Sequence, residues 1–344
     1  MSSPNLHIHT LRGLAILAIV LVHTALLQRV FSGEAGLPKE AFGNFLDRFS
    51  LLIEPIRIPL FTVISGWVYA CRPVEPGHLG QFFLGKAHRI GVPLLVVSIM
   101  EFGFQALRAR FAVPPQGGPP SFLDFLYLAP SHLWFLYAIL WIFLFVAIAE
   151  TVGLLRSVLH WLLVTLVAFG GYFLGPNHWN EIRVFDTAVP NHLRFFSGLL
   201  LLGFFLFGLG LNRFSRILIR KLGVWISAAL TVGFLLAIWT LAPTGPSLLA
   251  QSLNLGLALG GIYLLVALPW TWRPLAEIGT HSLPIYLYHG FAIYLAFTLM
   301  KWMNSNSWWL FLPFGILFGV ALPILFSKLV SRWQLGRRLF LGLK

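Results

Sequence analysis

Apolar runs separated by short polar connections make up almost the whole chain. Many of these runs reach or approach the length of about 20 residues that a helix needs to cross the hydrocarbon core of a bilayer. Polar and apolar residues do not alternate within the runs, as they would in the strands of a transmembrane barrel. The pattern therefore predicts an all-α, polytopic membrane protein with ten transmembrane helices, at 11–30, 50–71, 91–110, 132–149, 157–175, 193–211, 222–242, 247–268, 283–302 and 308–329.

The composition agrees with a membrane protein. Of the 344 residues, 58% are hydrophobic and 10% are charged, whereas soluble domains usually carry about 25% charged residues. The segment 121–130 is too short to cross, and no connection is long enough for a soluble domain. The first apolar run lacks a signal-peptide cleavage pattern, so we keep it as a span. We expect residues 1–344 to form a single transmembrane domain with no appended soluble domain.

The charge distribution predicts the orientation. The net charge is +13, and basic residues of membrane proteins gather in cytoplasmic connections. With a cytoplasmic N-terminus, the larger share of the Lys and Arg residues falls on the cytoplasmic side, including the cluster NRFSRILIRK at 212–221. Ten spans return the C-terminus to the same side, so both termini are predicted to be cytoplasmic. The bilayer thus accounts for the positive charge, and we expect no nucleic-acid partner.

Arg12 and His23 are two costly side chains within the first run, LRGLAILAIVLVHT. An arginine at bilayer depth costs roughly 2.5–3.5 kcal/mol on insertion scales. Eleven positions make about three helical turns, so both side chains leave the same face, roughly 16 Å apart along the axis. Arginine suits phosphate, and a buried histidine can act as a general base. The spacing leaves open a structural alternative, in which Arg12 anchors the helix and His23 bonds to a neighbouring helix.

A second polar group lies in EPIRIPLFTVISGW, residues 54–67. Glu54 and Arg57 stand three positions apart, close enough to pair on a helix. Pro55 and Pro59 favour a kinked helix, and irregular backbone at membrane depth usually lines a cavity. A structural ion pair that neutralises its own insertion cost is the alternative here.

Further candidates lie at both ends of the predicted spans. Lys86, His88 and Arg89 in FFLGKAHRIGVP open the third span and are suited either to lipid headgroups or to the phosphates of a cytoplasmic donor. His132, His192 and His289 have aromatic neighbours, and none of them has the spacing of a zinc-binding motif. We therefore predict no metal site.

Five stretches together resemble acyltransferase family 3, a family of integral membrane proteins. They follow the order of the family and extend over almost the whole chain, and the ten-helix core of the family agrees with the independent count of spans. The stretches are Arg12-x10-His23, LFTVISGWVY (60–69), FFLGKAHRI followed by a proline (82–93), SHLWFLYAIL (131–140) and IGTHSLPIYLYHG (278–290).

The resemblance implies transfer of an acyl group, usually acetyl from acetyl-CoA, to a hydroxyl of an envelope carbohydrate or a related, for example lipid-linked, acceptor. It also implies that His23 is the essential histidine of the first span and that Arg12 is its partner. Lys86 and Arg89 match a basic motif that is often written with two arginines, so the lysine is a departure. We expect the protein to lie in a bacterial inner membrane, and the sequence does not fix its oligomeric state.

These patterns predict a site in a central cavity between the helices. The expected catalytic residues are His23, Arg12, Glu54 and Arg57, the expected acetyl-CoA-binding residues are Lys86, Arg89 and Arg12, and the expected acceptor-binding residues are His132, Trp134, His192 and Arg194. We expect His289 to be structural. Direct transfer and an acyl-histidine intermediate both remain open.

A rival hypothesis is a transporter or flippase of a lipid-linked sugar or polysaccharide. Kinked helices and intramembrane charges suit it too, but the two halves of the chain show no matched pair of broken helices.

Overall fold

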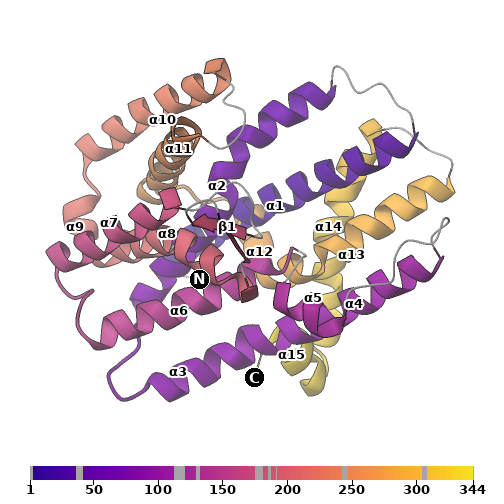
Figure 1. Cartoon of the computed structure of the whole chain (residues 1–344), viewed down its shortest axis with the longest axis horizontal. Helices are drawn as coiled ribbons and strands as arrows, with labels where there is room; N and C mark the ends of the chain where they lie inside the picture. The colour runs from indigo at the N-terminus through magenta and orange to yellow at the C-terminus, as the bar shows by residue number, and fades with distance from the viewer. Residues whose placement is uncertain are drawn as a thin grey trace. The chain divides into compact units, whose positions relative to one another are not determined.

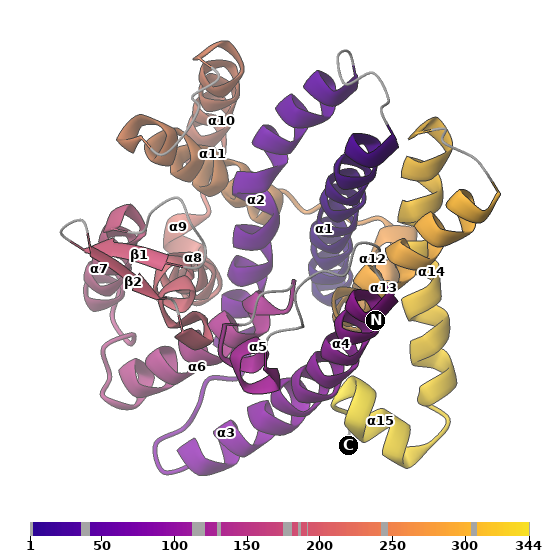
Figure 2. The ribbon, with the colours of Figure 1, turned by 45° about the vertical axis from the view of Figure 1, so that its right-hand side comes forward.

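Helices dominate the structure, a computed structural model shown in Figures 1 and 2. The all-α prediction is therefore confirmed. The chain divides into two compact units, residues 1–70 with 207–328 and residues 71–206 with 329–344. The structure describes residues 3–35, 42–111, 121–128, 132–174, 181–184, 187–190, 192–241, 247–303 and 308–343.

The first unit contains the beginning of the chain and most of its last third. The helix α8 begins in the second unit and ends in the first. The helix α14 belongs to the first unit except for its last residues, which belong to the second. Its elements are α1 (Ser3–Ala35), α2 (Phe42–Cys71), the end of α8 (Phe195–Arg213), α9 (Ser215–Leu218), α10 (Lys221–Leu241), α11 (Leu248–Ala267), α12 (Arg273–Thr280), α13 (Ser282–Trp302) and α14 (Trp308–Val330).

The second unit contains the middle of the chain and the C-terminal helix. Its two strands pair as an antiparallel hairpin, visible in Figure 2. Its elements are α3 (Leu79–Lys86), the π turn η1 (Ala87–Gly91), α4 (Val92–Phe111), α5 (Phe122–Leu128), α6 (Trp134–Thr151), α7 (Val158–Leu174), β1 (Glu181–Val184), β2 (Thr187–Pro190), the 3-10 turn η2 (His192–Arg194), the beginning of α8 and α15 (Gln334–Leu341).

The helices have the length and composition of membrane spans. Among the described residues, eight helical segments are long and apolar enough to cross a bilayer, and α7 is a shorter apolar helix. The helix α2 has 30 residues and is also long enough, although it carries Glu54 and Arg57. Each predicted span thus has a helix. Large apolar side chains such as Trp225 and Val167 are 74% and 78% exposed, as expected for helices that face lipid tails. A polytopic membrane protein is the architecture that these helices support.

Several helical boundaries differ from those expected. The helices α1 and α2 extend into the predicted connection 31–49, and helical backbone precedes the third span from Leu79 onward. The helix α2 is continuous through Pro55 and Pro59. Segment 121–130 forms only the short helix α5 in its described part, in agreement with its being too short to cross. The hairpin and the short helices α9, α12 and α15 were not predicted, because none of them is long enough to give a hydropathy signal.

Glycines allow α1 and α12 to approach each other closely. A Cβ added to Gly13 would meet the backbone carbonyl of Leu275, and a Cβ added to Gly279 would meet the carbonyl of His9. Each helix thus contributes one glycine to the same interface, and α12 packs closely against the first half of α1. This contact fixes the helix that carries Arg12 and His23.

We predict that Gly279→Ala destabilises the protein by about 1–3 kcal/mol, the usual cost of inserting a methyl group into a packed contact. The matched control is Gly233→Ala on α10, where an added Cβ meets nothing within 4 Å. Alanine there should leave stability unchanged or raise it, because alanine favours a helix. Thermal unfolding in detergent measures both, and equal melting temperatures for the two variants would contradict the close packing.

Candidate active site

Two histidines from opposite ends of the chain meet in the first unit. The Nδ1 of His23 on α1 lies 2.6 Å from the Nε2 of His289 on α13. The two ring planes differ by 5°, and their centroids are 4.9 Å apart. Rings stacked face to face could not bring two nitrogens so close, so the imidazoles meet edge to edge in nearly one plane. This is favourable geometry for a hydrogen bond between ring nitrogens.

The backbone of α13 holds His289 in this position. Its side chain is only 1% exposed. Its Nδ1 lies 2.8 Å from the carbonyl oxygen of Tyr286 and 3.0 Å from that of Ile285. The ring is therefore anchored at one nitrogen and points the other at His23. The sequence predicts a structural His289, and no local pattern connects it with His23, 266 positions away.

Glu54 and Arg57 form the ion pair that their spacing predicts. The Nη2 of Arg57 lies 3.8 Å from Oε1 of Glu54, with 13% of the arginine side chain and 50% of the glutamate side chain exposed. The guanidinium also interacts electrostatically with Tyr286 of α13, the residue whose carbonyl binds His289. Its buried Nε finds no hydrogen-bond partner among the described residues. Arg57 therefore brings a positive charge and an unused donor close to the segment that holds the histidine pair.

Arg12 and His23 lie on one uninterrupted helix, α1. The rise of 1.5 Å per residue then separates them by about 16 Å along the axis, on the same face. The sequence-predicted catalytic residues His23, Arg12, Glu54 and Arg57 all belong to the first unit.

Lys86 and Arg89 lie in the second unit, at the point where the helical backbone changes from α3 to the π turn η1. Such turns are rare and often mark functional sites. The Lys86 ammonium lies 3.8 Å from the centroid of the Phe143 ring and 5.0 Å from that of Phe82. The two rings attract the ammonium group through cation–π interactions. Arg89 is exposed, so it is the more accessible of the two basic groups.

The other four predicted residues lie near α5, α6 and η2 of the second unit. His132 and Trp134 are at the beginning of α6, and His192 and Arg194 bound η2. The ring of His192 stacks on Tyr127 with centroids 4.1 Å apart. Its Nδ1 is buried and has no hydrogen-bond partner in the part of the chain that the structure describes.

The backbone at η2 is strained. Leu193 and Arg194 have φ of 48° and 56°, values that residues with a side chain adopt rarely and at a cost. The Nε1 of Trp141 donates to the carbonyl oxygen of Leu193 over 3.0 Å, and the Arg194 side chain is only 3% exposed. Strained backbone of this kind is often found at binding sites.

A second polar cluster of this unit was missed by the sequence analysis. Tyr137 of α6 is hydrogen-bonded to Ser98 of α4 and interacts electrostatically with Glu101. The buried Oε2 of Glu101 has no hydrogen-bond partner among the described residues. A glutamate in the middle of an apolar segment was the available signal, since the chain has only 11 acidic residues.

His281 links the ends of two helices of the first unit. Its Nδ1 lies 3.2 Å from Oγ of Ser327, whose hydroxyl donates to the carbonyl oxygen of Ile324. Burial lowers the pKa of His281, the Lys328 ammonium lowers it further, and the Glu277 carboxylate opposes this change. A neutral His281 that donates to Ser327 fits this environment and points to a structural role.

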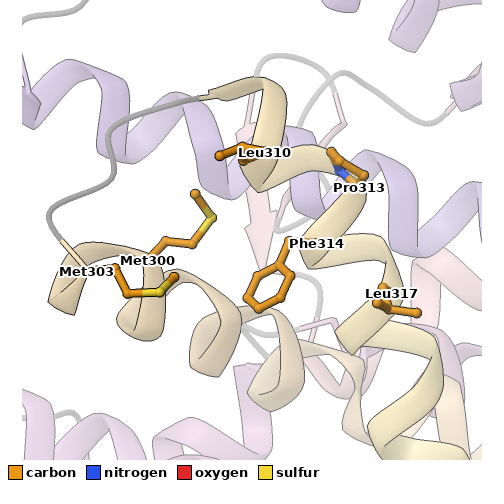
Figure 3. A pocket seen from close by; sticks show the side chains of 6 residues that line it. All are labelled: Met300, Met303, Leu310, Pro313, Phe314 and Leu317. Atoms are coloured by element: carbon orange, nitrogen blue, oxygen red, sulfur yellow. The ribbon is translucent and has the colours of Figure 1, made fainter.

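A cleft of about 330 Å³ lies between α13 and α14. Figure 3 shows its lining, in which Met300 comes from α13, Met303 directly follows that helix, and the other residues come from α14. All of the lining side chains are apolar, so the cleft offers space for hydrocarbon and no group for acid–base chemistry. The lining residues are Met300, Met303, Leu310, Pro313, Phe314 and Leu317.

The comparisons with known proteins give one match. A family model described as an acyltransferase domain matches residues 5–328, which include every candidate residue named above. This match confirms the resemblance that the five sequence stretches indicate. No curated protein and no solved structure matches the chain.

Proposed function

Because the chain belongs to acyltransferase family 3, we propose that this membrane acyltransferase is an O-acetyltransferase of the bacterial inner membrane. It moves an acetyl group from acetyl-CoA to a hydroxyl of an envelope carbohydrate or a lipid-linked sugar. The family match supports acyl transfer, and the apolar helices support the bilayer as its environment. The observation that carries the proposal is the hydrogen-bonded pair of His23 and His289, since acyl transfer to an alcohol needs a base.

His23 acts as that base. Its Nε2 takes the proton of the acceptor hydroxyl while the hydroxyl oxygen bonds to the thioester carbonyl carbon. The carbonyl electron pair moves to its oxygen and returns as the carbon–sulfur bond breaks. The departing thiolate takes the proton from the His23 imidazolium. The products are an acetyl ester and CoA with a free thiol.

Arg57 stabilises the negative oxygen that forms during this step. Its charge is largely withdrawn from solvent, and a charge acts more strongly in such surroundings than in water. The unused donor at Nε supports a role toward a transient partner. Glu54 lies 3.8 Å from Nη2 of the guanidinium and offsets part of its charge.

In the second unit, the basic side chains around η1 bind the phosphates of the donor. Arg89 is exposed and presents the planar donor fork that suits phosphate. Lys86 contributes a charge that Phe143 and Phe82 hold in place. In the first unit, Arg12 is the cation proposed to bind phosphate, on the helix that carries the base.

We predict that Arg89→Ala raises the KM for acetyl-CoA several-fold and leaves kcat nearly unchanged, because an exposed charge contributes binding energy that solvent weakens. Arg72→Ala is the matched control, since Arg72 is an exposed arginine of the same unit. Initial rates at varied acetyl-CoA concentration measure the effect. A lower kcat with an unchanged KM would contradict a role in donor binding.

His132, Trp134, His192 and Arg194 bind the acceptor. Sugars stack on aromatic rings and accept or donate hydrogen bonds at their hydroxyls, and the stacked Tyr127–His192 pair with its unused Nδ1 offers both contacts. The strained η2 backbone supports a binding role for this segment.

The experiment uses purified protein in liposomes, acetyl-CoA labelled in the acetyl group, and glycan extracts from envelopes of cells that lack the gene. We expect label in the glycan fraction, with a mass increase of one acetyl group per modified sugar. Unmodified glycan that crosses the membrane without gaining label would instead favour the transporter hypothesis and overturn the proposal.

A further inference from the structure

We infer that His289 is a positioning residue that keeps the proton of the neutral His23 ring on Nδ1, so that the lone pair lies on Nε2. The meaning of this for catalysis rests on the proposed function, because Nε2 is the atom that takes the hydroxyl proton. The tautomer itself is a property of the protein alone and can be measured without substrate.

His289 carries its proton on Nδ1. Both atoms near its Nδ1 are backbone carbonyl oxygens, of Tyr286 and Ile285. A carbonyl oxygen only accepts hydrogen bonds, so Nδ1 of His289 must carry a proton. In a neutral imidazole the other nitrogen is then an acceptor. The Nε2 of His289 therefore offers a lone pair to whatever faces it.

The contact between the two rings fixes the position of the His23 proton. Nδ1 of His23 faces that lone pair at 2.6 Å. Two lone pairs at this distance would repel each other, so one proton lies between the nitrogens, and it belongs to Nδ1 of His23. The edge-to-edge arrangement of the rings directs this proton along the line between the two nitrogens. A neutral His23 then carries its lone pair on Nε2.

The position of this proton decides which nitrogen of His23 can act as a base. A free imidazole in water favours the opposite tautomer, with the proton on Nε2, in which this nitrogen cannot act as a base. His289 removes that tautomer from the population. When His23 takes up a second proton, its Nδ1–H becomes a charged donor and the bond to His289 grows stronger. An orienting group behind a catalytic histidine has the same logic in hydrolytic triads.

The experiment measures the tautomer by long-range proton–nitrogen NMR on full-length protein with ¹⁵N-labelled histidine in detergent. His23→Gln identifies the His23 signals. We expect the wild-type ring to carry its proton on Nδ1, and we expect His289→Met to populate the Nε2–H form. A wild-type His23 with its proton on Nε2, or an unchanged tautomer in folded His289→Met protein, would overturn the inference.

Activity supplies a second readout that packing alone would not move. Glutamine at position 289 can place an amide oxygen near the position of Nε2 and accept the proton of His23, whereas methionine fills similar space and accepts poorly. We expect kcat to fall by about 10²-fold in His289→Met and to recover by at least 10-fold in His289→Gln, with the KM for acetyl-CoA unchanged in both. Equal losses in two folded variants would mean that His289 only fills space.

The two readouts separate this inference from the proposed function. If the wild-type protein transfers no acetyl group but the tautomer changes in His289→Met, the positioning role stands and the proposed reaction is wrong. If transfer occurs and the tautomer does not change, the proposed reaction stands and the positioning role is wrong.

Discussion

His23→Ala is expected to lower acetyl transfer by about 10²–10⁴-fold, the contribution that a positioned base makes to proton transfer. Without the imidazole of His23, the proposed base is missing, and the alcohol must attack the thioester in its neutral form. The measurement is the initial rate of label transfer from acetyl-CoA to glycan by purified variants in liposomes. Because His23 is only partly buried, we expect the variant to fold and insert.

His160→Ala is the matched control for this substitution. His160 is an exposed histidine at the start of α7, and its backbone N–H is bound by Ser157. Loss of its ring should leave both the rate and the melting temperature at wild-type values. If His23→Ala protein of wild-type thermal stability transferred acetyl groups at the wild-type rate, the assignment of the base would be wrong.

Arg57→Met is expected to lower kcat by about 10²–10³-fold, as the loss of one oxyanion-stabilising group does in other acyl-transfer enzymes. Methionine keeps an unbranched side chain of similar reach but has neither the charge nor the Nε donor. Arg57→Lys restores the charge and should recover only part of the rate, since lysine lacks the planar fork. Initial rates at saturating acetyl-CoA measure kcat for each variant.

Glu54→Gln tests whether the arginine acts through its own charge. Glu54 is half-exposed, so its ion pair with Arg57 is weakened by solvent and its removal should have a small effect on the rate. A loss in Glu54→Gln as large as that in Arg57→Met would show that the pair is required as a unit. An unchanged kcat in Arg57→Met, with wild-type stability, would remove Arg57 from the reaction.

The sequence predicts the features of the fold that depend only on residues close together in the chain. Hydropathy predicts the helices because a span in lipid must pair its backbone N–H and C=O groups within itself. The periodicity of 3.6 residues relates Arg12 to His23 on α1, and the three-residue spacing gives the Glu54–Arg57 pair. These relations need no knowledge of other helices.

Relations between distant segments could not be predicted in the same way. The partnership of His23 with His289 depends on how α1 and α13 pack, and a single sequence contains no signal for a contact across 266 positions. The same holds for Ser98 and Tyr137, which lie on different helices. Local departures from regular helix, such as the π turn at η1 and the positive φ of Leu193, left no hydropathy pattern either.

If Arg12 binds the donor phosphates and His23 is the base, as proposed, the continuous helix α1 sets a minimum length for the acyl carrier. The helix separates Arg12 from His23 by about 16 Å along its axis. A carrier whose phosphates bind to Arg12 must therefore extend about that far for its reactive carbon to reach the imidazole. The long flexible arm of CoA meets this requirement, whereas acetyl phosphate, with its carbonyl next to its charge, is too short. In the proposed function, the first helix therefore selects donors by their length as well as by their charge.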